Sequence, residues 1–299
     1  RMFPVFAASG DALMVVAYVG AFTSIFAAVI GCTQDDIKRV LAFSTLSQLG
    51  YMMFALGVAT MEHSLGYTAS MFHLFTHAFF KALLFLGAGA VIHAVHSNEI
   101  WDMGGLARKM PFTHVTFLVA TLAIAGIWPL AGFFSKDEIL ASALATGHKG
   151  IFALGLVVAG MTAFYMFRIY FVTFWGKPRG HGAEHAHEAP FIMLVPLFIL
   201  AVLSVVAGFV PMGQFISLGH AAHGEGGHEG INLAIAIPAT VLALCGISAA
   251  WLLYGRETKL ADGLVAKMGA AYGIIKKKFY FDEIYLFVTK KVIFRLVAA

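Results

Sequence analysis

Charged residues are scarce in this chain. They make up 12% of its 299 residues, whereas hydrophobic residues make up 60%. A soluble globular domain carries about 25% charged residues, so the composition excludes a soluble protein and an intrinsically disordered one. The same numbers exclude a nucleic-acid-binding surface, although the net charge is +4. The alternation typical of an outer-membrane β-barrel is also missing. These absences leave a polytopic α-helical membrane protein.

Cysteine is nearly absent too. Cys32 and Cys245 are the only cysteines, and each lies in or beside an apolar segment. Two thiols in this setting predict small apolar side chains and not a disulfide framework. The chain opens at Arg1 without a signal-peptide pattern and stops inside an apolar run. We therefore expect it to be an internal piece of a longer subunit.

Long apolar segments are what the sequence does contain. Most have about the 20 residues needed to cross roughly 30 Å of hydrocarbon. They cover approximately 13–32, 37–58, 65–95, 113–146, 150–175, 191–210 and 231–254. The fourth segment is too long for one plain span, and it contains the run Gly126–Gly132, which includes Pro129. This run predicts two half-helices joined by a loop within the membrane.

The last part of the chain has a different character. From Gly255 onward it is basic and amphipathic, which predicts an interfacial helix and not a further plain span. We therefore divide the chain into a transmembrane domain, 1–254, and an amphipathic segment, 255–299.

Basic residues gather in every second loop when successive loops alternate between the two sides of the membrane. One side then carries Lys38, Arg39, Arg108, Lys109, Lys177, Arg179 and every basic residue from Arg256 onward. The other side carries only Arg1 and Lys149. The positive-inside rule makes the first side cytoplasmic. This predicts a bacterial-type inner (plasma) membrane protein whose residue 1 faces outward and whose basic C-terminal segment lies inside.

Two polar loops, 181–188 and 220–229, are rich in histidine and glycine. Such tracts resemble metal-binding segments. The predicted topology puts them on opposite faces of the membrane, so they cannot form one site together. We interpret them as solvated loops and predict no metal site.

Ionisable residues inside a span are candidates for function, because each costs about 3 kcal/mol to insert. His73, His77 and Lys81 are spaced i, i+4, i+8, which lines them along one face of a helix over about 12 Å. Such a row is what a proton relay requires. A metal pair, a haem ligand and plain interhelical hydrogen bonding are the alternatives. The metal-pair alternative lacks the glutamate that follows the first histidine in a zinc-protease helix, because Leu74 follows His73 here.

The broken helix carries Ser135, Lys136, Asp137 and Glu138 in succession, which has the form of a capping box. On this interpretation the second half-helix begins at Lys136, with Ser135 as its N-cap. The positive end of the helix dipole and burial would both disfavour the ammonium charge, whereas pairing with Asp137 would favour it. This balance would let Lys136 load and release a proton.

Two weaker candidates complete the set. Ser44, with Gln48 one turn later, belongs to a polar stripe that follows Asp36 and Lys38 and extends to Ser47 and Tyr51. The stripe can hold water between helices, or it can simply join them by hydrogen bonds. Arg168 lies two turns from the predicted cytoplasmic end, where its side chain could snorkel to the surface.

Four stretches carry a resemblance to a known family. They are DIKRVLAFSTLSQLGY at 36–51, HLFTHAFFKALLF at 73–85, MGGL at 103–106 and AGFFSKDEIL at 131–140. They resemble the antiporter-like subunit L of proton-pumping NADH:quinone oxidoreductase, or respiratory complex I. The resemblance is dense over 12–140. Further on, KFYFDEIY at 278–285 is similar to the start of the long lateral helix of that subunit.

The resemblance implies roles for the candidate residues. The central hydrophilic axis that connects half-channels would include His73, His77 and Lys81. Lys136 would be the key ionisable residue of the second broken helix, with Asp137 as its neighbour, and Asp36 and Lys38 would lie near the cytoplasmic side. The first broken helix of the family would precede residue 1, and most of the lateral helix would follow residue 299.

The resemblance also implies partners. NADH oxidation and quinone reduction occur in other subunits of such complexes, so NADH, FMN, iron–sulfur clusters and quinone are expected there and no cofactor is expected in this chain. The expected contacts are the lipid bilayer and other membrane-arm subunits, above all the neighbouring antiporter-like subunit.

Three alternatives stay open. The large subunit of a multisubunit Na⁺/H⁺ antiporter shares these motifs but has no redox partner. The membrane arm of a hydrogenase- or ferredoxin-linked complex is another relative. A non-transporting membrane scaffold is an alternative of another class. The interrupted helix with its lysine argues against a scaffold, which has no need of so costly an arrangement.

Overall fold

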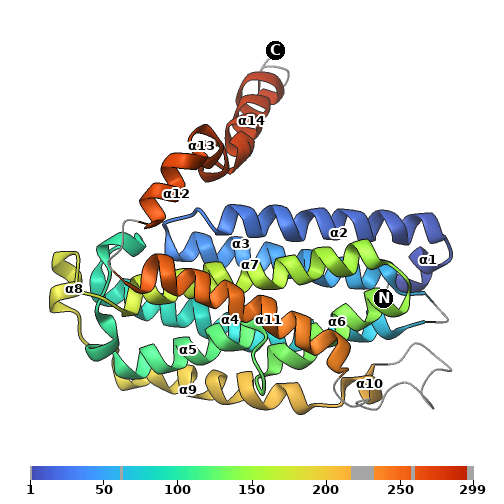
Figure 1. Cartoon of the computed structure of the whole chain (residues 1–299), viewed down its shortest axis with the longest axis horizontal. Helices are drawn as coiled ribbons and strands as arrows, with labels where there is room; N and C mark the ends of the chain where they lie inside the picture. Colours follow the sequence, from blue (N-terminus) through green and yellow to red (C-terminus); the bar gives the residue numbers. More distant parts are fainter. Residues whose placement is uncertain (1, 61–62, 217–231, 257–259, 295–299) are drawn as a thin grey trace. The chain divides into compact units, whose positions relative to one another are not determined.

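The computed structural model describes residues 2–60, 63–216, 232–256 and 260–294, and these are mostly helical (Figure 1). Contacts divide the chain into two units, Arg1–Glu257 and Thr258–Ala299. Within the described ranges no β-strand forms, and an isolated bridge joins Asp36 to Glu99. The all-α fold class predicted from the sequence is therefore confirmed.

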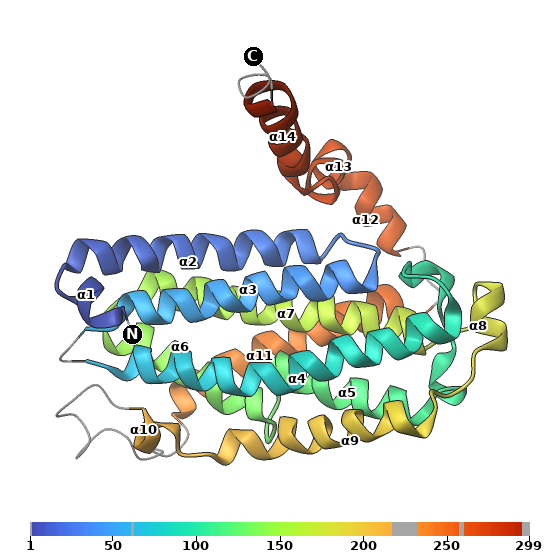
Figure 2. The ribbon, with the colours of Figure 1, turned by 180° about the vertical axis from the view of Figure 1, so that it is seen from behind.

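Six helices in the described part of the first unit are long and apolar enough to cross a membrane. They are α2 (Gly10–Gly31), α3 (Ile37–Val58), α4 (Leu65–Val95), α7 (Lys149–Phe174), α9 (Phe191–Val206, continued to Phe209) and α11 (Leu233–Ala250, continued to Gly255). The predicted segments 37–58 and 65–95 coincide with α3 and α4. Two short helices, α1 (Phe3–Ala7) and α10 (Met212–Phe215), lie at one end of this bundle (Figures 1 and 2).

The fourth predicted segment, 113–146, is broken into two half-helices, as the sequence predicts. α5 (Pro111–Ala125) and α6 (Ala131–Ala145) are separated by five residues that include Pro129. Gly126 ends α5 because its φ of 78° lies in the left-handed region that glycine adopts without strain. The two halves then pack closely, since a Cβ on Gly132 would lie 1.9 Å from the backbone oxygen of Ala123. The first turn of α6 thus rests directly on the last turn of α5.

Small residues also bring α2 and α3 together. A Cβ on Gly20 would lie 2.5 Å from the backbone nitrogen of Phe54, and a Cβ on Gly50 would lie 2.6 Å from that of Ser24. Such close approach is the usual packing of helices in membranes, where small residues let backbones meet.

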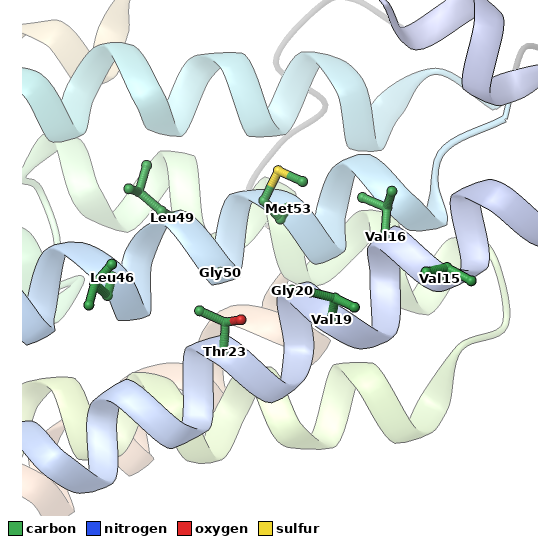
Figure 3. A pocket seen from close by; sticks show the side chains of 9 residues that line it. All are labelled: Val15, Val16, Val19, Gly20, Thr23, Leu46, Leu49, Gly50 and Met53. Carbon is green, nitrogen blue, oxygen red and sulfur yellow. The ribbon is translucent and has the colours of Figure 1, made fainter. Parts of the chain in front are cut away.

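A groove of about 340 Å³ runs along the outer side of this helix pair (Figure 3). It is lined by Val15, Val16, Val19, Gly20, Thr23, Leu46, Leu49, Gly50 and Met53. Thr23 supplies the one side-chain oxygen among these residues. The groove therefore suits hydrocarbon and offers no set of ligands for an ion.

Loops that follow alternate helices bind one another at the end of the bundle opposite α1 and α10. The backbone nitrogen of Ile37 donates to the oxygen of Asn98 over 3.0 Å, and that of Gly105 donates to the oxygen of Trp175 over 2.9 Å. The short helix α8 (His181–His185) lies at the same end (Figure 1). The loops that hold most of the basic residues therefore share one side, as the topology requires.

The second unit is a series of short helices. They are α12 (Leu260–Met268), α13 (Ala270–Lys276) and α14 (Phe281–Phe287), the last continued by a π-helix over Val288–Ile293. Three successive residues with positive φ interrupt the series between α13 and α14: Lys278, Phe279 and Tyr280. The assignment of this unit to the start of a lateral helix, and its place at the membrane interface, remain predictions.

Candidate functional site

Three ionisable side chains of α4 lie in the interior of the bundle. His73 is fully buried, and His77 and Lys81 are each 5% exposed. The ring centroids of His73 and His77 are 5.9 Å apart. α4 thus carries the three groups as one buried row, in keeping with their helical spacing.

His73 connects three helices. Its Nδ1 lies 2.8 Å from Ser135 Oγ of α6, and its Nε2 lies 3.1 Å from Gln48 Oε1 of α3. Thr76 Oγ1 donates to the same serine oxygen over 2.9 Å. The row on α4 is therefore joined on one side to the broken helix and on the other to the polar stripe of α3.

Lys136 reaches back across the interruption of the broken helix. It is 4% exposed, and its Nζ donates to the backbone oxygen of Ile124 over 2.5 Å. That carbonyl lies in the last turn of α5, where carbonyls lack intrahelical partners. The negative end of the α5 dipole favours the ammonium, whereas burial opposes it. Small movements of α5 would therefore change how well the charge is stabilised.

The predicted start of α6 is wrong. α6 begins at Ala131 with Leu130 at its N-cap, so Ser135 does not cap the helix and Lys136 lies in the second turn. The Ser135 hydroxyl instead bonds His73 and the backbone oxygen of Ala131. The capping-box pattern misled because a serine inside a helix can also bond its own backbone or a neighbouring helix. Lys136 therefore faces the negative end of α5 and not the positive end of α6.

The predicted pairing of Lys136 with Asp137 is also wrong. The described residues include no salt bridge between them, and the buried Oδ1 of Asp137 has no hydrogen-bond partner. Adjacent residues of a helix point about 100° apart, which separates the two groups. His77 Nε2 and Lys81 Nζ are buried without a partner in the same way. Buried polar atoms that lack a protein partner are ones to which ordered water forms hydrogen bonds in folded proteins.

A second set of polar side chains joins α3 to α7. Tyr165 Oη donates to Ser44 Oγ over 3.1 Å, and Gln48 Nε2 donates to Thr162 Oγ1 over 3.3 Å. All four residues are buried. The stripe on α3 is therefore part of an interhelical hydrogen-bond network. Sequence analysis missed Thr162 and Tyr165, although with Arg168 they recur at i, i+3, i+6 on one face of α7.

Arg168 does not snorkel to the surface. It is 1% exposed, its Nη2 lies 2.7 Å from Asp35 Oδ1, and its Nη1 donates to the backbone oxygen of Gln34 over 2.5 Å. Its guanidinium also lies 5.4 Å from the ring centroid of Tyr254. The ion pair with Asp35 holds the arginine inside the bundle, where it ties α7 to the loop between α2 and α3. Asp35 is the partner that sequence analysis did not find.

The structure keeps Asp36 and Lys38 apart from the buried row. Asp36 caps α3, because its carboxylate accepts a hydrogen bond from the backbone nitrogen of Arg39 over 3.0 Å. Lys38 is exposed. Asp36 precedes Gln48 by twelve residues, which is about 18 Å along a helix. Both residues therefore belong to the end of the bundle.

We expect Arg168→Met to lower the thermal stability of the protein. The change removes the guanidinium that pairs with Asp35 Oδ1, and breaking a buried ion pair costs about 3 kcal/mol. The apparent Tm of the detergent-solubilised assembly measures the loss. Lys38→Met, which removes an exposed cation from the same end, is the matched control. An equal Tm for the two variants would contradict a structural role for the pair.

No group of three or more histidine, cysteine, aspartate or glutamate residues in the described part of the chain is placed to hold a metal ion. The first histidine-rich loop forms α8 and the segment after it, with the rings of His181 and His185 4.6 Å apart. The second, 220–229, lies outside the described residues. Cys32 and Cys245 are free thiols, as predicted.

Comparison with known proteins decides the family. A family described as the transmembrane part of NADH:quinone oxidoreductase and Mrp antiporter matches residues 1–162. The chain belongs to this family. It is 47% identical to NADH-quinone oxidoreductase subunit L of Rhodobacter capsulatus, over 75% of this chain and 34% of that one. It is 43% identical to NAD(P)H-quinone oxidoreductase chain 5 of a Picosynechococcus species, over 95% of this chain and 48% of that one.

A solved structure gives the same result for the fold. The Mrp complex from a Dietzia species contains a chain that is 26% identical to this one, with a TM-score of 0.66, over 79% of this chain and 27% of that one. This chain therefore has the antiporter-like fold of the family and is an integral membrane protein. It spans about half or less of the length of the relatives that it matches.

Proposed function

We propose that this chain is the proton-translocating part of a membrane-arm subunit of NADH:quinone oxidoreductase. The observation that carries the proposal is a buried row of ionisable groups on α4 that meets a broken helix with a buried lysine. His73 bonds α6 through Ser135, one residue before Lys136. Curated relatives named as subunit L or chain 5 of such complexes support the redox branch of the family.

The proposed path uses four groups that can gain and lose a proton. Lys136 holds its proton against the Ile124 carbonyl and would release it when α5 moves. His73, His77 and Lys81 would pass protons along α4, with water bridging the buried atoms that have no protein partner. The carboxylate of Asp137 would stabilise a proton that arrives near α6. Asp36 and Lys38 would act at the end of the bundle, nearer the proton source.

We further propose the assembly and its orientation. The neighbours of this chain would be other membrane-arm subunits, in particular another antiporter-like subunit. NADH, FMN, iron–sulfur clusters and quinone would bind in partner subunits. The end of the bundle that holds most basic loops would face the cytoplasm, so that protons move outward.

The experiment that tests the redox branch uses the native assembly, purified from membranes through this subunit. We expect it to oxidise NADH with quinone and to show the absorbance of bound flavin and iron–sulfur clusters. An assembly without these signals, whose reconstituted vesicles exchange Na⁺ for H⁺, would contradict the proposal. The specific alternative is then the large subunit of a multisubunit Na⁺/H⁺ antiporter, which the likeness to the Mrp complex favours.

We expect replacement of both His73 and His77 by glutamine to reduce proton translocation about tenfold or more, because positioned acid–base groups contribute at least this much to proton transfer. Glutamine keeps hydrogen-bonding ability but does not titrate in this range. The measurement is proton uptake by membrane vesicles during NADH oxidation. His93→Gln, at the C-terminal end of the same helix, is the matched control. Undiminished translocation in the double variant would show that the two histidines only pack.

A further inference from the structure

The two ring nitrogens of His73 face different helices. Nδ1 lies 2.8 Å from the Ser135 hydroxyl of α6, and Nε2 lies 3.1 Å from the Gln48 side chain of α3. A neutral imidazole carries a proton on one nitrogen only, and the hydrogen bond at one nitrogen fixes the state of the other. The partner at Nε2 therefore determines whether Nδ1 can accept a proton from α6.

Thr162 determines how Gln48 is oriented. Its Oγ1 lies 2.8 Å from the backbone oxygen of Val158, which can only accept a hydrogen bond. The single hydroxyl proton of Thr162 is used there. At its contact with Gln48 the threonine oxygen must therefore accept, and only the amide nitrogen of Gln48 can donate to it, over 3.3 Å.

This orientation leaves the Gln48 carbonyl oxygen facing His73. A carbonyl oxygen accepts, so the proton of the neutral ring must lie on Nε2. We propose that Gln48 and Thr162 are positioning residues that hold neutral His73 as the Nε2–H tautomer, with the lone pair of Nδ1 directed at Ser135. All three side chains are fully buried, so bulk water does not compete for these hydrogen bonds.

The arrangement makes proton exchange at His73 favour the side of α6 over the side of Gln48. Thr76 donates to Ser135 over 2.9 Å, and the one hydroxyl proton of Ser135 can then go to the lone pair of His73 Nδ1, 2.8 Å away, because the competing backbone oxygen of Ala131 is farther, at 3.2 Å. A proton that arrives from the side of α6 finds an acceptor at Nδ1. On the other side, the amide of Gln48 separates His73 from the hydroxyls of Tyr165 and Ser44. An amide does not titrate near neutral pH, so it restricts proton exchange in that direction.

The consequence of this inference for proton transfer rests on the proposed function. The test of the His73 tautomer is independent of that function. The test is ¹⁵N nuclear magnetic resonance of the complete assembly in membranes, labelled at histidine, with the His73 signals identified by their loss in a His73→Gln variant. We expect a pyridine-type Nδ1 and a protonated Nε2 in the unmodified protein. Thr162→Val should shift the tautomer ratio about fivefold toward Nδ1–H, the factor that corresponds to one neutral hydrogen bond. Thr162→Ser, which keeps the hydroxyl, should leave the ratio unchanged.

Gln48→Leu gives a second route to the same result, because it removes the acceptor at Nε2 without touching Thr162. An Nδ1–H tautomer in the unmodified protein would overturn the inference. So would an unchanged ratio in both Thr162→Val and Gln48→Leu. Proton translocation by the same membranes is measured separately. If the tautomer responds as expected while the His73 and His77 double variant still translocates protons fully, the proposed function fails and the tautomer assignment stands.

Discussion

Lys136→Ala is expected to stop proton transfer through this subunit almost completely. Lys136 is the group that the proposed path uses to release a proton at the broken helix, and alanine cannot carry a proton. Proton flux through the subunit should fall about 100-fold, within the range that a positioned acid–base group contributes. The measurement is proton translocation by vesicles that contain the complete assembly, with NADH oxidation recorded in parallel.

Two further variants make this result specific. Lys136→Gln retains a donor for the Ile124 carbonyl, so it separates loss of titration from loss of the contact that joins α6 to α5. We expect it to fold normally and to lose translocation equally. Lys149→Ala removes an exposed lysine at the start of α7 and should leave translocation unchanged. Full translocation by an assembled Lys136→Gln protein would remove Lys136 from the path.

Gly132→Ala is expected to cause the largest structural effect of a single added methyl group. The new Cβ would lie 1.9 Å from the backbone oxygen of Ala123, so α6 must move away from α5. We expect a loss of about 3 kcal/mol of stability, the upper end for overpacking. Because Lys136 bonds α5 through Ile124, the displacement should also lower proton translocation.

The matched control is Gly89→Ala in α4, where the added Cβ has no atom within 4 Å. Alanine favours a helix over glycine by about 1 kcal/mol, so this variant should be as stable as the unmodified protein or slightly more so. The comparison uses the apparent Tm of the solubilised assembly and its yield in the membrane. Equal Tm values for the two variants would contradict the close contact between the halves of the broken helix.

The membrane helices could be predicted from the sequence because hydropathy is a local property. An apolar run of sufficient length has to form a helix in hydrocarbon, where each backbone polar group needs an internal partner. This explains why segments 37–58 and 65–95 coincide with α3 and α4. The interruption near Pro129 follows from equally local chemistry, since proline and glycine restrict or release the backbone at their own positions.

The partners of the buried polar groups could not be predicted in this way. His73 bonds residues 25 and 62 positions away in the chain, and Arg168 pairs with Asp35, 133 positions away. A sequence pattern such as Ser135-x-x-Glu138 has no means of showing that another helix will take up the serine hydroxyl.

The sequence alone therefore determined an α-helical membrane protein of this family, with a buried ionisable row on one helix and one broken helix. Only the tertiary structure decided that Lys136 bonds the end of α5, that Asp137 stands apart from it, and that Gln48 and Thr162 orient His73. The physical reason is that helices form from contacts within about four residues, whereas hydrogen bonds between helices depend on how the complete bundle packs.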